Sequence, residues 1–356
     1  MHGMKLAVYI SGHGFGHLAQ VAPVLNELQR RYSNCTVLIR CALAEEEIRA
    51  RLTFDFQLDR ESVDVGVVQK SAIEEDREAS IDQLRHWLAD MDARVQREKR
   101  LLAEFSPDLI LSNISPLAFP VARALAVPSI GLATLDWHTI YSSWLEPDDP
   151  ALAVLAKAYA CCDLLCTPPM AMVMPVFPEQ RKVPLIAAKP QPVSYALPVA
   201  ASKTALVIFG GSAQPPFDYQ ALARCSGWHF LMPEAPADAP ANVSAIRFDA
   251  SLRAVDVMPY VDAVVCKPGY GILSECWSTS TPIVWVERPD FPEFPMLKGW
   301  LESHFPAAGM SRREFSAGEW LHALEKSRQS PRSYPDPAGD GAQTVAELIS
   351  RVLLRD

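Results

Sequence analysis

The stretch AVVCKPGYGILSECWSTSTPIVWV, residues 263–286, decides the fold class of this chain. It begins with a short apolar run, passes through a glycine-containing turn into a helical pattern, and ends in a second apolar run at residues 282–286. Short β-branched runs joined by a helical segment are typical of a strand-helix-strand unit with two parallel strands. The sequence therefore predicts an α/β protein.

The same alternation occupies both halves of the chain. Apolar runs predict strands at residues 6–11, 36–40, 109–112, 129–133, 164–167, 205–210, 228–232, 245–248, 263–266 and 282–286. Residues 75–105 contain one long charged helical pattern, to which we assign no role. Prolines at residues 184–204 separate the halves, because proline removes a backbone donor. We therefore predict a Rossmann-like domain at residues 1–185, a linker at 186–204, a second Rossmann-like domain at 205–330, and a tail with a final helix at 331–356.

Length and composition exclude several classes of protein. The 356 residues exceed one ordinary domain of ~100 to 200 residues, and 49% hydrophobic against 21% charged residues excludes a disordered chain. With 33 Lys and Arg against 42 Asp and Glu the net charge is −9, so we expect no nucleic-acid partner. No apolar run approaches the ~20 residues of a transmembrane helix, and we predict a cytoplasmic protein. The eight cysteines lie mostly in apolar stretches without the paired spacing of a zinc site, which predicts reduced core residues.

The first glycine-rich loop, SGHGFGH at residues 11–17, follows the first predicted strand and precedes a helical pattern. Ligands of open α/β sheets bind beyond the carboxyl ends of the strands, and glycine lets the backbone approach them. An imidazole titrates near neutral pH and can take a proton from a hydroxyl group, so His13 and His17 are candidate general bases. Gly14, Phe15 and Gly16 lie between them and are predicted to belong to the same ligand-binding site. Two imidazoles without a nearby acid make a poor metal site, so we predict no metal here.

Two further glycine loops occur in the second half, FGGSAQ at residues 209–214 and CKPGYGILSE at residues 266–275. The latter passes from a strand into a helix, so the amides of Gly269 to Gly271 would point at a phosphate group above the helix start. It matches neither the P-loop nor the dinucleotide G-x-G-x-x-G pattern. Glu275 lies about one turn into the helix, where a carboxylate can bind both hydroxyls of a ribose.

The SGHGFGH loop together with CKPGYGILSECWSTSTPIVWVERPDFPEFPMLKGWLE, residues 266–302, resembles glycosyltransferases of the GT-B fold. The chain most resembles the glycosyltransferase-like amino-terminal region of plant-type L-arabinokinases. It is more distantly similar to the family that adds N-acetylglucosamine to the lipid-linked peptidoglycan precursor. Supporting matches at residues 109–113 and 135–141 extend the resemblance over most of residues 5–302. It implies two Rossmann-like domains with parallel sheets facing each other across a cleft, the first for the acceptor and the second for a nucleotide-sugar, favouring a UDP-sugar.

The resemblance also implies roles for individual positions. His17 would be the general base, Asp136 its orienting carboxylate, and His13 the alternative base. Glu275 would bind the ribose and Glu293 the sugar hydroxyls. The other predicted donor-site residues are Gly210, Gly211, Ser212, Lys267, Pro268, Gly269, Tyr270, Gly271 and Ser274.

Glycosyl transfer needs charge stabilisation for a departing diphosphate, which helix-start amides can supply without a divalent ion. The sequence has no acidic cluster suited to Mg²⁺, so we predict inverting, metal-independent transfer and no cofactor besides the donor substrate. Trp137, Trp144 and Tyr141 could line an apolar pocket for the acceptor, whose identity the sequence leaves open, as it does the oligomeric state.

Two departures from the family and two other functions bear on this reading. Asn113 stands where the family often has an acid. The chain ends at residue 356, without room for the sugar-kinase domain of arabinokinases, so kinase activity is not expected. A sugar-nucleotide 2-epimerase of the same fold would convert the donor with no acceptor. A non-catalytic nucleotide-sugar-binding protein would keep Glu275 and the glycine loops but would need neither histidine.

Overall fold

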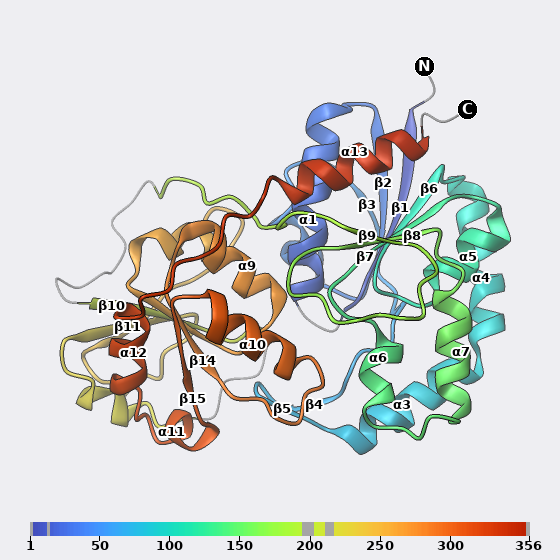
Figure 1. Ribbon diagram of the computed structural model, residues 1–356. Coiled ribbons are helices and arrows are strands. Elements are labelled where there is room, and N and C mark those ends of the chain that lie inside the picture. Colours follow the sequence, from blue (N-terminus) through green and yellow to red (C-terminus); the bar gives the residue numbers. More distant parts are fainter. Residues whose placement is uncertain (1–2, 13–14, 194–202, 211–216, 354–356) are drawn as a thin grey trace. The chain divides into compact units, whose positions relative to one another are not determined.

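The computed structural model describes residues 3–12, 15–193, 203–210 and 217–353. The chain divides into two compact units, each of which combines a parallel sheet with helices (Figure 1). Unit 1 comprises Met1–Val68, Asp76–Ile186 and Pro337–Asp356, and unit 2 comprises Gln69–Glu75 and Ala187–Asp336. The predicted α/β fold class is confirmed.

Among the described residues, unit 1 contains a parallel sheet of seven strands in the order β3-β2-β1-β6-β7-β8-β9. These strands are β1 (Met4–Ile10), β2 (Cys35–Arg40), β3 (Gln57–Asp59), β6 (Leu109–Asn113), β7 (Ser129–Leu132), β8 (Leu164–Thr167) and β9 (Gln180–Lys182). The strand order reverses at β1, whose Ile10 pairs with Asn113 of β6. Ligands of open α/β sheets bind beyond the carboxyl ends of the strands at such a reversal.

The helices of unit 1 are α1 (Phe15–Arg31), α2 (Glu45–Arg49), α3 (Arg77–Ala89), α4 (Met91–Phe105), α5 (Ala118–Leu125), α6 (Trp137–Ser142), α7 (Pro150–Tyr159) and α13 (Gly341–Leu353). The charged pattern that we predicted as one long helix is divided into α3 and α4. Asp90 separates them with φ −103° and ψ 15°, outside the helical region. A break of one residue leaves the apolar spacing almost unchanged, which is why the sequence pattern did not reveal it.

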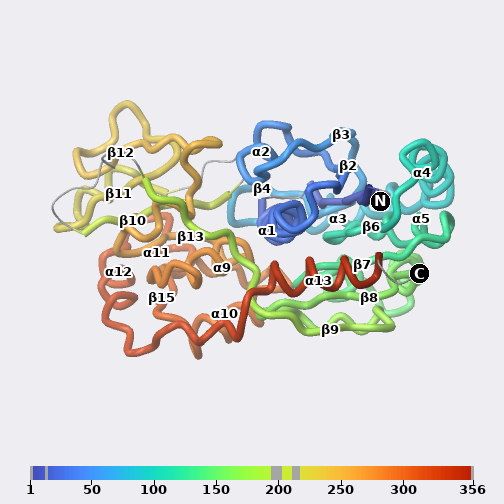
Figure 2. The backbone as a smooth tube through the Cα atoms, turned by 90° about the horizontal axis from the view of Figure 1, so that it is seen from above, coloured from blue at the N-terminus to red at the C-terminus, as the bar shows by residue number. Residues whose placement is uncertain are grey.

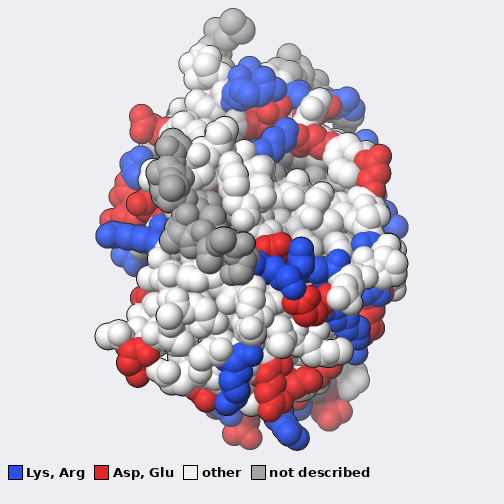
Figure 3. Space-filling view, turned by 90° about the vertical axis from the view of Figure 1, so that its left-hand side faces the viewer, with Lys and Arg blue, Asp and Glu red and all other residues white. Residues whose placement is uncertain are grey.

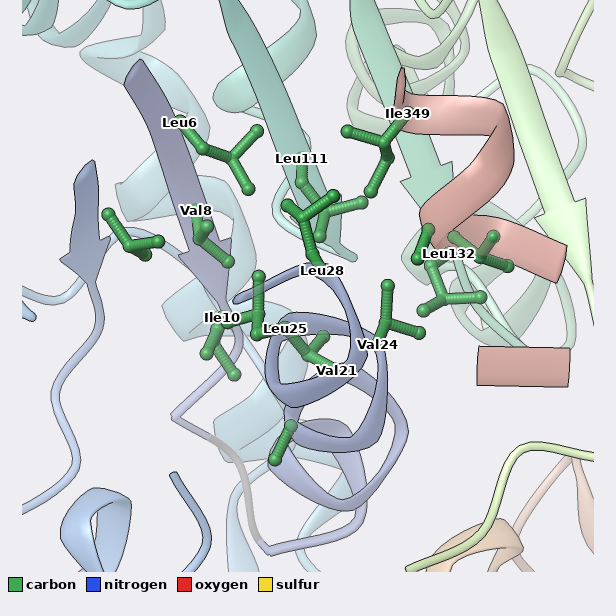
Figure 4. Packing of buried hydrophobic residues seen from close by; sticks show 14 of the residues in the cluster. Leu6, Val8, Ile10, Val21, Val24, Leu25, Leu28, Leu111, Leu132 and Ile349 are labelled. Carbon is green, nitrogen blue, oxygen red and sulfur yellow. The ribbon is translucent and has the colours of Figure 1, made fainter. Parts of the chain in front are cut away.

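The core of unit 1 lies between its sheet, α1 and α13. Figure 4 shows these apolar side chains pointing toward one another, among them Leu6, Val8, Ile10, Val21, Val24, Leu25, Leu28, Leu111, Leu132 and Ile349. Each fully buried Leu, Ile or Val side chain contributes ~1.5–3 kcal/mol. Figures 1 and 2 both show α13 beside α1, although the two helices lie at opposite ends of the sequence. The final helix is α13, in which Val345, Leu348 and Ile349 are buried.

In the part of unit 2 that the structure describes, six strands form a parallel sheet in the order β12-β11-β10-β13-β14-β15. Its strands are β10 (Lys203–Ile208), β11 (Trp228–Met232), β12 (Val243–Ala245), β13 (Ala263–Cys266), β14 (Ile283–Val286) and β15 (Ala307–Met310). Its helices are the 3₁₀ helices η1 (Gln220–Arg224) and η2 (Met258–Tyr260), and α8 (Ala254–Val257), α9 (Tyr270–Thr279), α10 (Phe294–His304), α11 (Arg312–Ser316) and α12 (Leu321–Arg328). The order reverses at β10, whose Ile208 pairs with Cys266 of β13. Two of the predicted glycine loops follow these two strands.

One part of unit 2 comes from the first half of the sequence. The short antiparallel strands β4 (Gln69–Ser71) and β5 (Glu74–Glu75) form a hairpin, drawn in blue in Figure 1. Ala72 and Ile73 of this hairpin are buried in the apolar core of unit 2. The sequence did not predict the hairpin, because polar residues dominate it and only tertiary contacts assign it to unit 2.

The domain limits expected from the sequence differ from the two units at three places. The hairpin belongs to unit 2, residues 187–202 of the expected linker are also grouped with unit 2, and residues 337–356 belong to unit 1. The predicted strand at 245–248 lies earlier, at Val243–Ala245, and β15 was not predicted. These differences arise because contacts between distant segments, rather than local pattern, decide which unit a segment joins.

The surface of the described residues carries both signs of charge. Figure 3 shows side chains of both signs in separate groups on one face, with uncharged residues between them. None of the described helices combines the length and the apolar character needed to cross a membrane.

Candidate active site

The carboxyl ends of β1 and β6 bring the first glycine loop beside Asn113. The backbone N–H of Ser11 donates to the carbonyl oxygen of Asn113 at 2.8 Å. His17 lies in the first turn of α1, and its Nδ1 atom is 2.7 Å from Oδ1 of Asn113. The predicted general base therefore lies at the strand-order reversal of unit 1.

A chain of hydrogen bonds assigns the tautomer of His17. Nδ2 of Asn113 donates to Oε1 of Gln20 at 3.1 Å, and Nε2 of Gln20 donates to Oγ1 of Thr134 at 3.4 Å. Since Oδ1 of Asn113 is then an acceptor, Nδ1 of His17 carries the proton. The neutral ring has its lone pair on Nε2, which makes no hydrogen bond with a described residue.

The surroundings of His17 favour the neutral imidazole. Burial lowers the pKa of His17, and the hydrogen bond with Asn113 opposes part of this shift. His17 is 9% exposed, and the indole ring of Trp137 lies beside it with 6.0 Å between ring centroids. A neutral imidazole at physiological pH is the form that a general base requires.

Asp136 has a different place from the one expected of it. Its carboxylate accepts from the backbone N–H of Thr139 at 2.8 Å and from the Thr139 hydroxyl at 2.7 Å. Asp136 therefore caps the amino terminus of α6, as an Asp before a helix commonly does. Asn113, and not Asp136, contacts Nδ1 of His17 in the structure.

The aromatic residues expected to line an acceptor pocket are divided between core and surface. Trp137 and Tyr141 are fully buried, and the Tyr141 hydroxyl donates to the carbonyl oxygen of Gly66 at 2.7 Å. Tyr141 thus belongs to the core of unit 1. Phe15 is half-buried and Gly16 is exposed, so these two loop residues remain accessible at the end of β1.

Asp64 is a second titratable group beside the glycine loop, and the sequence analysis did not identify it. Burial raises the pKa of Asp64 to about 6, while hydrogen bonds with Ser11, Trp137 and the backbone of Val65 lower it. The backbone N–H of Val65 donates to Oδ1 of Asp64 at 2.8 Å. Asp64 lies in an irregular segment without a recognisable motif, so no sequence signal distinguishes it.

In unit 2, the chain passes from β13 through Lys267, Pro268 and Gly269 into α9. Gly269 has extended φ of −167°, which any residue adopts, and no described atom lies within 4 Å of a Cβ atom built on it. Neither the backbone conformation nor protein packing requires glycine there, whereas close approach of a ligand would. The first N–H groups of α9 have no partner within the helix, which makes this a suitable place for an anion.

The other predicted residues of this loop are mostly buried. Tyr270, Ser274 and Glu275 are 3%, 1% and 3% exposed. The Ser274 hydroxyl donates to the carbonyl oxygen of Gly271 at 3.0 Å, which stabilises the first turn of α9. After β10, Gly210 has φ of +64°, the left-handed conformation that favours glycine.

Two ionisable groups in unit 2 have shifted pKa values. Burial, and then the charge of Arg288, lowers the pKa of Lys267 to about 8, while Glu75 opposes the shift. Burial raises the pKa of Glu293 to about 7, and Arg288 opposes that shift. Shifts of this kind are typical of functional sites, and both groups lie near Arg288, which the sequence analysis did not identify.

Several predicted residues lie outside the described part of the chain, namely His13, Gly14, Gly211 and Ser212. Among the described residues, no group of three or more His, Cys, Asp or Glu side chains could hold a metal ion.

No protein-family model matches the chain. The chain is 25% identical over 363 residues to L-arabinokinase from Arabidopsis thaliana, an alignment that covers 99% of this chain and 34% of the relative. The chain thus spans about a third of the length of that relative.

Solved structures give a closer account of the fold. The glycosyltransferase of kitacinnamycin superposes with a TM-score of 0.65 at 18% identity, covering 98% of both chains. The Streptomyces sp. SF2575 glycosyltransferase SsfS6, in complex with thymidine diphosphate, gives 0.57 at 17% identity, with 98% of this chain and 99% of that one covered. MurG from Acinetobacter baumannii gives 0.54 at 15% identity, again with coverage of 98% and 99%. The chain therefore has the GT-B fold, which it shares with these glycosyltransferases.

Proposed function

We propose that this protein is an inverting glycosyltransferase that moves a sugar from a nucleotide-sugar to a hydroxyl group of an acceptor without a metal ion. The observation that carries the proposal is the contact between His17 and Asn113 at the end of β1. This contact orients the ring with the Nε2 lone pair available at the carboxyl end of β1, where this class of sheet binds ligands, and burial favours the neutral form of the imidazole.

In the proposed reaction, the acceptor oxygen attacks the anomeric carbon of the sugar and forms the new C–O bond. The acceptor proton moves to Nε2 of His17, and Asn113 keeps the ring oriented through Nδ1. The bond between the anomeric carbon and the diphosphate oxygen breaks, and its electron pair stays on the leaving nucleoside diphosphate. Attack from the face opposite the leaving group inverts the anomeric centre.

The second unit supplies the proposed donor site. The α9 start at Gly269, the Lys267 amine and the buried Glu275 carboxylate lie on one strand-helix connection next to the reversal at β10. Helix-start amides and an ammonium group suit a diphosphate, and a carboxylate suits ribose hydroxyls. Glu293, buried near Arg288, is proposed to bind sugar hydroxyls.

Two finer assignments rest on narrower support. UDP is proposed as the nucleotide from the sequence resemblance, and thymidine diphosphate is a second candidate because SsfS6 binds it. The cytoplasm is proposed as the location because all eight cysteines are free thiols and seven of them are buried. A compartment that keeps thiols reduced suits such a chain.

The proposal is tested by incubating the protein with UDP-, TDP- and GDP-sugars, EDTA and a metabolite extract as the source of acceptor. Release of nucleoside diphosphate together with a product heavier by one sugar is the expected result. The His17→Ala variant should lose transfer, whereas His229→Ala should keep it, because His229 lies in unit 2 and bonds only Ser244. Isomerised donor without a new glycoside, or equal activity in both variants, would contradict the proposal.

A further inference from the structure

Lys267 and Arg288 lie at the same edge of the unit 2 sheet. Lys267 directly follows the last residue of β13, and Arg288 comes two residues after the end of β14. The two strands are parallel neighbours, with Cys266 opposite Trp285, so their carboxyl ends meet at one edge. The start of α9 belongs to this edge as well.

The side-chain amine of Lys267 makes no hydrogen bond or ion pair with a described residue. Lys267 is half-buried, and Arg288 is near enough for its charge to disfavour the protonated amine, while the charge of Glu75 opposes this effect. Two neighbouring cations of which one has no carboxylate partner are costly in a protein interior, unless an anion binds between them. Such a pair is what a phosphate-binding site requires.

Arg288 pairs with one carboxylate among the described residues. Its Nη2 atom pairs with Oε1 of Glu75, and the two side chains are 7% and 3% exposed. The guanidinium group lies 4.4 Å from the ring centroid of Phe291. Nε of Arg288 makes no hydrogen bond with a described residue, although it is buried. A buried guanidinium donor of this kind gains free energy when it meets an acceptor.

Glu75 reaches Arg288 because the hairpin of β4 and β5 is built into unit 2. Ile73 is 2% exposed in the core of this unit, and Nη2 of Arg312 donates to its carbonyl oxygen at 3.3 Å. The hairpin therefore places a carboxylate on Arg288 from a fixed position. Burial raises the pKa of the neighbouring Glu293 to about 7, so below that pH one paired carboxylate stands opposite the two cations and positive charge remains for a further anion.

We propose that Lys267 and Arg288 together bind the diphosphate of the donor, and that Glu75 is the positioning residue that holds Arg288 at this place. The inference rests on the proposed glycosyl transfer and adds Arg288 and Glu75 to its donor site. When the bond to the anomeric carbon breaks, the electron pair adds negative charge to the phosphate oxygen. Two fixed cations stabilise this charge more in the transition state than in the bound donor.

The test measures binding of inorganic pyrophosphate in EDTA at low ionic strength by calorimetry, which needs neither the nucleotide nor the acceptor. Lys267→Met is expected to weaken binding ~10- to 100-fold, the loss of one charge-assisted contact. Arg288→Gln alone would leave Glu75 buried without its cation, so the variant for this pair is Glu75→Gln with Arg288→Gln. It is expected to bind pyrophosphate at least ~10-fold more weakly than Glu75→Gln alone.

Glu75→Gln separates the proposal from a merely structural ion pair. The amide oxygen can still accept from Arg288 but no longer competes as an anion, so pyrophosphate should bind ~3- to 10-fold more tightly. Arg328→Gln is the matched control, because Arg328 is an exposed cation of the same unit and pairs with Asp262 rather than with the hairpin. Its affinity should stay within about twofold of the unaltered protein, since exposed charges are screened.

Two outcomes would overturn the inference: no binding of pyrophosphate to the unaltered protein, or unchanged affinity in the folded double variant. A parallel titration with UDP and TDP separates it from the proposed function. Nucleotide binding that the double variant retains in full would reject Arg288 while leaving glycosyl transfer intact. In the reverse case, the unaltered protein binds pyrophosphate but no nucleotide, and the double variant loses pyrophosphate binding. This result would support the anion site and contradict the proposed glycosyl transfer.

Discussion

Oδ1 of Asn113 lies 2.7 Å from Nδ1 of His17, so a neutral amide orients the proposed base. GT-B sequences that the chain resembles often have an acid at the position of Asn113. A carboxylate would orient the ring and strongly stabilise its protonated form, whereas the neutral amide orients the ring and offsets only part of the lowering of the His17 pKa by burial. The base of this protein is therefore expected to stay neutral to lower pH than a histidine paired with a carboxylate.

Asn113→Asp should shift the pH profile of transfer. A carboxylate beside Nδ1 raises the pKa of His17 by ~1 to 2 pH units, because it stabilises the imidazolium. As the pH is lowered, the rate of the variant should therefore begin to fall at a higher pH than the rate of the unaltered protein, since only the neutral ring accepts the proton. Rates measured from pH 5 to 9 check this, and an unshifted acid limb would count against His17 as the base.

Asn113→Ala, which removes the orienting acceptor, should lower kcat ~10- to 100-fold.

Affinity for a nucleoside diphosphate should fall as pH rises through 8. The pKa of Lys267 is lowered to about 8, so its positive charge is lost above that pH. The pKa of Glu293 is raised to about 7, so its carboxyl group becomes negatively charged as the pH rises through 7. Both changes disfavour an anion, and affinity should be highest below pH 7. Dissociation constants measured from pH 6 to 9.5 test this, and Lys267→Met should show a flatter dependence than the unaltered protein.

Glu275→Ala should weaken nucleotide binding by ~1–3 kcal/mol, the loss of two charge-assisted hydrogen bonds to ribose. Glu302→Ala is a suitable control, because Glu302 is exposed on α10 and pairs with Lys298 of the same helix. Calorimetric titration of both variants with the same nucleotide gives the comparison. Equal dissociation constants for the two would remove Glu275 from the site.

Gly341→Ala should destabilise unit 1. A Cβ atom at Gly341 would lie 2.8 Å from the Leu185 carbonyl oxygen and 2.6 Å from Cγ1 of Ile186, where α13 begins. Overpacking of this kind costs ~1–3 kcal/mol. Gly299→Ala in α10 has no described atom within 4 Å of its new Cβ and should instead stabilise the helix by ~0.5–1 kcal/mol. Thermal unfolding of both variants checks the opposite signs, and a shared direction would refute this account of α13.

Sequence patterns identified the central strands because these are buried on both faces and consist of continuous apolar residues. The predicted limits of 164–167, 228–232 and 263–266 are those of β8, β11 and β13. β9 was missed because all three of its residues are exposed and polar. The division of residues 75–105 at Asp90 left no periodic signal.

The same contrast applies to the candidate site. His17 and Gly269 belong to local glycine motifs, so the sequence alone marks them as candidates. Asn113, Asp64 and Arg288 acquire their places only when strand ends and loops come together in the fold. Asp136 was assigned to His17 by resemblance. In the structure its carboxylate accepts from the backbone N–H of Thr139, three residues later, and caps α6.

The most direct test of the central claim is calorimetric titration of the unaltered protein with UDP, TDP and GDP in EDTA. We predict that one of these diphosphates binds with a micromolar dissociation constant and that EDTA leaves the constant unchanged. Absence of binding by all three, in a folded protein, would contradict the assignment of unit 2 as a nucleotide-sugar donor site.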